Sequence, residues 1–146
     1  MEIVRENLYI PFCIPRTRTS GGYTRSTKPT LHMGMQDSGA MISCMTEATM
    51  RAFPAFSSRF HARPDVVRGV GGHTCRTLGE VRRVPISIGE DQQSGSIFLC
   101  TFRVTEGKGY TIIFGLNLLV PLHASIDISR RRITFSGAKD STGARP

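Results

Sequence analysis

Apolar and polar residues alternate along much of this chain with the two-residue period of β-strands. The alternation is clearest over residues 98–104, where every second residue is apolar and Thr101 and Arg103 fall on the opposite face. Residues 84–88 alternate in the same way. Residues 111–114 form an apolar run that suits a strand buried on both faces. The pattern predicts a mostly β protein.

Other segments predict further strands and two short helices. Residues 8–14 and 31–36 are expected to be extended, and so is a last hairpin that carries Ile126, Ile128, Ile133 and Phe135. Thr46 can cap a helix over residues 47–53, which Pro54 would end. Residues 116–122 predict one or two more helical turns. Residues 57–65 are polar and predict a connection between elements.

The length of 146 residues fits one domain. We expect a single domain over residues 1–146 with its core at about 8–135. A basic loop at 16–28 is an insertion, and residues 137–146 are a frayed tail. No internal repeat interrupts this organisation.

The formal net charge of +8 is concentrated in two places. Residues 16–28 carry three arginines and a lysine without an acid, and residues 130–132 are three consecutive arginines. Such runs are most often solvated loops, so contact with nucleic acid through the basic loop is the less favoured interpretation.

The four cysteines, at 13, 44, 75 and 100, form no closely spaced pair. Their spacing argues against a zinc ribbon or a dense disulfide scaffold and is compatible with a reducing compartment. The first residues lack a secretory pattern, and the most apolar run, 112–122, is too short to span a bilayer. We expect a cytoplasmic protein that needs no cofactor or metal and makes no membrane contact.

Residues 66–77 form two extended runs around a glycine-rich centre, which predicts a hairpin whose tip is 68–72. An ordinary glycine turn is the simplest interpretation. A functional one is a lid that closes over an extended peptide, because glycines supply hinge freedom and let another backbone approach closely. No helix start with a suitable lysine follows, which argues against a phosphate-binding loop.

Asp37 stands at the end of an apolar strand and is followed by Ser38, Gly39 and Ala40. Such a turn can simply hold its own aspartate by local hydrogen bonds. It can also fix a carboxylate for catalysis if a second carboxylate lies within a few ångströms, because the two then share one proton and act as acid and base. The chain has one such turn, so a twofold-symmetric dimer would have to supply the second.

Three blocks in order carry a family resemblance: DSGA at 37–40, GVGG at 69–72, and IIFGLNLL at 112–119 followed by HASID and RRRITF. Over about residues 8–135 the chain resembles the retropepsin family of retroviral-type aspartic proteases. Its pattern is closest to the proteases of Ty3/gypsy-type retroelements and the protease domain of cellular DNA-damage-inducible proteins. The resemblance implies a closed, mostly antiparallel barrel with one or two short helices, acting as an obligate homodimer.

The resemblance also implies a reaction, in which Asp37 of each subunit activates a water that hydrolyses peptide bonds of a polyprotein or another protein substrate. Ser38 would brace the paired carboxylates, Gly39 would offer its carbonyl to the substrate, and Ala40 would line the cleft. The hairpin tip and one pocket residue complete the set of substrate-binding residues: Val70, Gly71, Gly72 and Ile113. The terminal strands would interleave at the dimer interface.

The chain also departs from the family pattern at five positions near these blocks. Gly34 and Gln36 replace apolar β-branched residues before the aspartate, and Met41 replaces an acid that viral members carry. Leu116 lacks the arginine of viral members, and Asn117 stands where the family commonly has aspartate. A retropepsin-fold module that dimerises or binds with weak or no catalysis is therefore an alternative. A basic RNA-associated capsid or accessory protein is another.

Overall fold

The computed structural model describes residues 2–4, 9–15, 30–68, 70–89 and 97–136. The predicted basic loop at 16–28 and the predicted tail at 137–146 lie outside these residues. So does the 90–95 segment between two of the strands.

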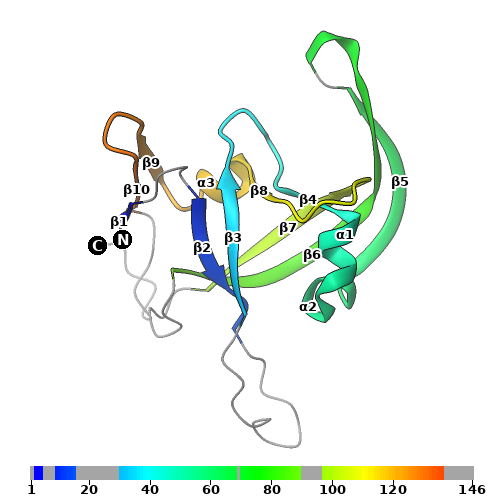
Figure 1. Cartoon of the computed structure of the whole chain (residues 1–146), viewed down its shortest axis with the longest axis horizontal. Coiled ribbons are helices and arrows are strands. Elements are labelled where there is room, and N and C mark those ends of the chain that lie inside the picture. Colours follow the sequence, from blue (N-terminus) through cyan, green and yellow to red (C-terminus); the bar gives the residue numbers. More distant parts are fainter. Residues whose placement is uncertain (1, 5–8, 16–29, 69, 90–96, 137–146) are drawn as a thin grey trace, which may run out of the picture.

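Six strands form a closed barrel (Figure 1). Their order in the sheet is β2, β3, β8, β4, β7, β6, and β6 pairs with β2 to close the ring. The β3–β8 and β4–β7 pairs are parallel and the other pairs are antiparallel. The predicted closed, mostly antiparallel barrel is thus confirmed. The bounds of the strands are β2 Tyr9–Cys13, β3 Leu31–Gln36, β4 Cys44–Thr46, β6 Thr74–Ile88, β7 Ile97–Thr105 and β8 Ile112–Phe114.

Alternation places one face of each strand inside the barrel. On β7, Cys100, Phe102 and Val104 are buried, whereas Thr101 and Arg103 between them are only partly so. Phe102 packs against Phe114 of β8, with ring centroids 5.9 Å apart, and against Phe56 at 6.3 Å. Burial of these large apolar side chains is the main stabilising term of the domain.

A long hairpin extends from the barrel (Figure 1). Its arms are β5 (Phe60–Arg68) and the first half of β6, joined at a turn over Val70–Gly72. Gly71 and Gly72 have φ angles of 83° and 80°, a region that favours glycine. The hairpin with a glycine tip is as predicted.

The prediction that residues 57–65 are a polar connection is wrong from Phe60 onward. Among the described strands, β5 pairs only with β6 and lies outside the closed ring. Most of its described side chains are exposed, so pairing rather than burial holds it. A shift in register between Ala62 and Asp65 accommodates Pro64, which cannot donate to the ladder.

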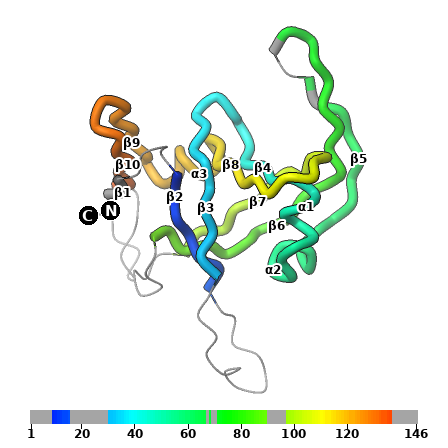
Figure 2. Tube along the Cα trace, viewed as in Figure 1, coloured from blue at the N-terminus to red at the C-terminus, as the bar shows by residue number. Residues whose placement is uncertain are grey.

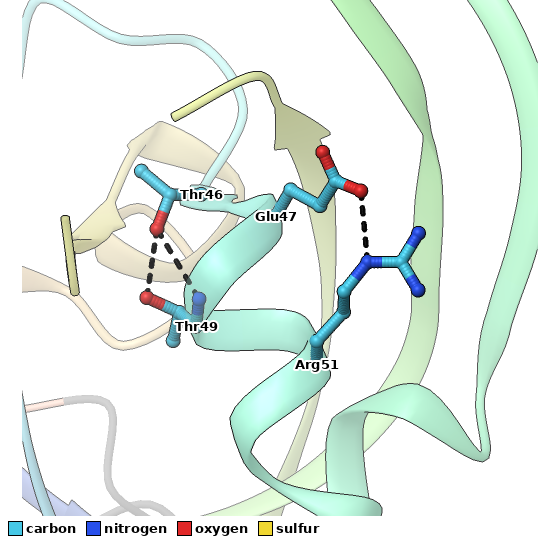
Figure 3. A network of polar contacts seen from close by, with 4 residues as sticks. All are labelled: Thr46, Glu47, Thr49 and Arg51. Atoms are coloured by element: carbon cyan, nitrogen blue, oxygen red, sulfur yellow. Dashed lines mark hydrogen bonds and ion pairs between the residues drawn. The ribbon is translucent and has the colours of Figure 1, made fainter. Parts of the chain in front are cut away.

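Three short helices complete the described chain: α1 (Glu47–Ala52), α2 (Pro54–Ser57) and α3 (Leu116–Leu119). Thr46 caps α1 as predicted, because its hydroxyl accepts a hydrogen bond from the Thr49 N–H at 3.4 Å (Figure 3). Glu47 forms an ion pair with Arg51, one turn along the helix, at 2.8 Å (Figure 3). Pro54 ends α1 and also starts α2, since proline suits the first turn of a helix.

A second sheet joins the two ends of the described chain (Figure 2). Its order is β1 (Glu2–Val4), β10 (Arg132–Phe135) and β9 (Ala124–Asp127). The β9–β10 hairpin was predicted, but Ile128 lies in its turn and is 78% exposed, so it is not part of the strand. Within the described residues, no helix has the length and apolar character needed to cross a membrane.

Candidate active site

The segment from Asp37 to Ala40 is a tight turn that follows directly from β3. The Asp37 N–H donates to the carbonyl of Phe114 at 2.9 Å, which extends the β3–β8 pairing by one residue. The Gly39 N–H donates to Asp37 Oδ1 at 2.9 Å, and the Ala40 N–H donates to the Asp37 carbonyl at 3.1 Å. One carboxylate oxygen is therefore fixed by its own turn, and the side chain remains partly exposed at the end of the barrel strand.

The start of α3 supports this turn from the other side. Leu116 N–H donates to the Ala40 carbonyl at 2.8 Å, and Asn117 N–H donates to the Met41 carbonyl at 3.1 Å. The approach requires a glycine before the helix, since a Cβ at Gly115 would lie 2.7 Å from the Ala40 carbonyl oxygen. The turn and the helix thus form one hydrogen-bonded unit.

The side chain of Asn117 connects this unit to Ser43 and to strand β7 of the barrel. Its Oδ1 accepts from both the N–H and the hydroxyl of Ser43, and its Nδ2 donates to the carbonyl of Thr101 at 3.0 Å. The Ser43 hydroxyl in turn accepts from the Gly115 N–H at 3.0 Å. Although the sequence marks Asn117 as a departure from the family's aspartate, it satisfies several polar groups beneath the turn.

A cleft of about 490 Å³ lies between the turn and the hairpin. Residues 39–42 of the turn and Cys44 of β4 form one wall, and Arg68, Cys75 and Thr77 of the hairpin form another. Strand β7 contributes Arg103 and Thr105. A cleft of this size suits a small ligand or part of a peptide.

Two cysteines line this cleft, and they differ in how far they are exposed to solvent. Burial raises the pKa of the Cys44 thiol, the charges of Asp37 and Cys75 raise it further, and Arg103 opposes them. Cys44 is therefore a protonated, weakly nucleophilic thiol at neutral pH. Cys75 is exposed on the hairpin. Among the described residues, no three His, Cys, Asp or Glu side chains gather in a way that could hold a metal ion.

Three fungal proteins, each called DNA damage-inducible protein 1, are similar to this chain. The Neurospora crassa protein is 30% identical over 102 residues, which cover 69% of this chain and 21% of that protein. The Chaetomium globosum protein is 31% identical over 104 residues (70% and 22%), and that of Phaeosphaeria nodorum is 39% identical over 70 residues (48% and 14%). The chain therefore spans less than a quarter of the length of these relatives. No family model matches it.

The fold is similar to the crystal structure of the retroviral protease-like domain of Ddi1 from Leishmania major, with a TM-score of 0.56. That match covers 88% of this chain and 86% of the other at 24% identity. The chain resembles the retropepsin-like family in sequence and has its fold. The resemblance to this family predicted from the three sequence blocks is confirmed, and the domain has the family's barrel.

The retropepsin-like domain brings only some of the predicted site residues together. Gly39 and Ala40 line the cleft, with Asp37 and Ser38 in the same turn. Gly71 and Gly72 are exposed at the hairpin tip, outside the cleft lining, and Val70 begins the same turn. Ile113 is partly buried on β8 between Met35 and Cys44 and is not among the residues that line the cleft.

Most of the cleft lining of this retropepsin-like domain was not singled out from the sequence. Arg103 and Thr105 lie on the polar face of β7, opposite Phe102, so the alternation that identified the strand also contained them. Arg68 directly precedes the glycine tip. Cys44, Cys75 and Thr77 carry no comparable signal, because only the closed barrel brings their strands to one cleft.

Proposed function

We propose that this domain is an aspartic endopeptidase that works as a homodimer. The observation that carries the proposal is the position of the Asp37 turn, beside a cleft that a glycine-tipped hairpin borders. A peptide in extended form could lie in this cleft and bond to the hairpin by backbone groups, as an added strand does. Peptide bonds of a polyprotein or of another protein are the proposed substrate.

The chemistry requires two carboxylates, and each chain offers one in the DSGA turn. A twofold axis beside Asp37 would bring the two copies together, where they share one proton. The ionised carboxylate takes a proton from water, the water oxygen bonds to the peptide carbonyl carbon, and the protonated carboxyl group gives its proton to the carbonyl oxygen, which becomes a hydroxyl. The carbon–nitrogen bond then breaks: the carboxyl group that took the water proton gives it to the leaving amine, and the other carboxylate takes a proton from one hydroxyl as the carbonyl re-forms.

The neighbouring residues have proposed roles that follow from their places. Ser38 is exposed beside Asp37 and would brace the pair across the axis. Gly39 and Ala40 would contact the substrate backbone and one of its side chains. Gly71 and Gly72 allow the hairpin tip to move over the bound peptide. Ile113, whose strand pairs with β3, would contribute apolar surface next to the reacting group.

The test compares two aspartate replacements in a diverse peptide mixture at about pH 4 to 7, with and without a pepstatin-type inhibitor. Asp37→Asn keeps an oxygen for the Gly39 N–H but cannot act as a base, so cleavage should fall by at least about a thousandfold. Asp65→Asn is the matched control, because Asp65 is exposed on β5 and its carboxylate accepts a hydrogen bond from the N–H of its neighbour Val66. Activity that survives Asp37→Asn in a pure sample would refute the mechanism.

The oligomeric state is measured in the same samples by analytical ultracentrifugation. A dimer that cleaves, and loses cleavage but not dimerisation on Asp37→Asn, supports the proposal. A dimer that cleaves nothing would favour a binding or assembly module with the same fold. A chain that cleaves as a monomer would contradict the shared site.

A further inference from the structure

The cleft beside the Asp37 turn is lined by two arginines and by no carboxylate. Arg68 is the last residue of β5 and Arg103 lies near the end of β7. The rest of the lining consists of apolar side chains, two threonines and two thiols. The cleft is thus an electropositive site in a chain whose net charge is already +8.

Neither arginine is neutralised within the part of the chain that the structure describes. The ion pairs there engage other arginines: Arg51, Arg76, Arg82 and Arg130. Guanidinium groups that line a cleft without an internal partner are available to a ligand, and they match a carboxylate with two parallel hydrogen bonds.

The two arginines come from different strands that line the cleft, Arg68 from β5 and Arg103 from β7. The backbone of Arg103 is held in the barrel wall, because its backbone N–H donates to the Ser43 carbonyl at 2.8 Å and the residue pairs with Cys44 in the parallel β4–β7 ladder. Its charge acts on the Cys44 thiol, where it opposes the rise in pKa that burial, Asp37 and Cys75 produce. Arg68 pairs with Thr74 next to the glycine tip, so it belongs to the hairpin.

We propose that this cleft is a subsite that selects an acidic side chain of an extended peptide, which binds to Arg103 of strand β7 and to Arg68 of the hairpin. This inference rests on the proposed function and adds the class of substrate. Asp37 is not part of the cleft lining, whereas residues 39–42 are, so the acidic side chain would flank the bond that is cleaved. Met41 and Ile42, which also line the cleft, are apolar. An acidic residue at either position would repel an acidic substrate side chain.

The test measures binding without turnover, in the full chain carrying Asp37→Asn. Fluorescence anisotropy at low salt compares pools of labelled octapeptides that carry Glu or Gln fixed at one position and are mixed elsewhere. At one position at least, the Glu pool should bind about tenfold more tightly than the Gln pool. Arg103→Gln should abolish this preference, and Arg68→Gln should reduce it by about threefold.

Arg63→Gln is the matched control, because Arg63 is an exposed arginine of the same strand β5 that does not line the cleft. It removes one charge and should leave the preference unchanged. Arg103→Glu should reverse the preference toward a pool with Lys fixed at that position, a result that a merely unfolded variant cannot give. Circular dichroism checks that each variant keeps its strands.

Equal binding of the Glu and Gln pools at every position, or no binding of any pool, would overturn the inference. So would a preference that Arg63→Gln weakens as much as Arg103→Gln, or tight binding of an RNA oligonucleotide that displaces the Glu pool. Cleavage by the unmodified chain without a Glu preference would refute the subsite and leave the protease proposal standing. A Glu preference in a chain that cleaves nothing would support the subsite and refute the protease proposal.

Discussion

The amide oxygen of Asn117 accepts two hydrogen bonds from Ser43, one from its backbone N–H at 2.8 Å and one from its hydroxyl at 2.6 Å. Ser43 has no exposed surface, and its carbonyl accepts from the Arg103 N–H at 2.8 Å. The two residues are 74 positions apart in the chain. Their contact connects the helix behind the Asp37 turn to the strand that carries Arg103.

Replacing Asn117 with alanine should destabilise the domain by about 2–4 kcal/mol, because the buried N–H and hydroxyl of Ser43 lose their acceptor. Asn117→Asp should cost less, since a carboxylate still accepts from Ser43 and only the bond to the Thr101 carbonyl is lost. Urea unfolding at equal protein concentration gives both values. An alanine variant as stable as the aspartate variant would show that the Ser43 contacts contribute little.

Gly34 lies on β3 directly under the ring of Phe114, and a Cβ at this position would overlap that ring. Gly34→Ala should therefore destabilise the domain by about 1–3 kcal/mol. Combining it with Phe114→Leu should recover part of the loss, so the two changes should be non-additive in a double-mutant cycle of unfolding free energies. Simple additivity would mean that the chain relaxes elsewhere.

Burial explains which elements could be predicted from the sequence. Strands β2, β3, β7 and β8 place apolar side chains in the barrel, so their residue pattern contains the signal. Strands β1 and β4, and the part of β5 before Val66, were not predicted: β4 is three residues long with only Met45 buried, and β5 is held by pairing with β6. A strand that is held by backbone hydrogen bonds alone has no characteristic pattern of apolar side chains, so the sequence gives little sign of it.

One part of the candidate site could be predicted from the sequence, and the other could not. The Asp37 turn is continuous in sequence and could be recognised from its four residues and the blocks that follow. The cleft is assembled from residues far apart in the chain, such as Ala40, Arg68 and Arg103, so its charge depends on how the barrel closes. The departures at Gly34 and Asn117 have structural explanations, in the Phe114 ring and the Ser43 contacts, that only the three-dimensional arrangement reveals.

Gln36 precedes Asp37 and carries a buried side-chain oxygen, Oε1, that has no hydrogen-bond partner among the described residues. Gln36→Leu should raise the free energy of unfolding by about 1 kcal/mol, because it removes an uncompensated polar group from the interior. Gln36→Glu, of nearly the same shape, should lower it at neutral pH, because a charge is then buried there. Urea unfolding of the two variants should move in opposite directions; a loss of stability in Gln36→Leu would mean that the amide is satisfied in the native assembly.

His32 is 7% exposed and is enclosed by aromatic rings: its centroid lies 5.2 Å from that of Phe12, 4.7 Å from Phe53 and 5.3 Å from Phe56. Burial lowers the pKa of His32 from its ordinary value of 6.5. Below that value the unfolded chain binds a proton that the folded chain does not, so stability is complete above 6.5 and is lost as pH falls toward the folded pKa. This is the mildly acidic range in which a shared carboxylate pair would be active.

The free energy of unfolding should therefore fall as pH drops below 6.5, by at most about 1.4 kcal/mol per pH unit. His32→Phe removes the titrating group while keeping an aromatic ring, so its stability should be flatter over this range. His61→Gln is the control, because His61 is an exposed residue of β5, and the decline should persist in it. Urea titrations of the three proteins at several pH values measure the slopes; an equal slope in His32→Phe would assign the acid sensitivity to other groups.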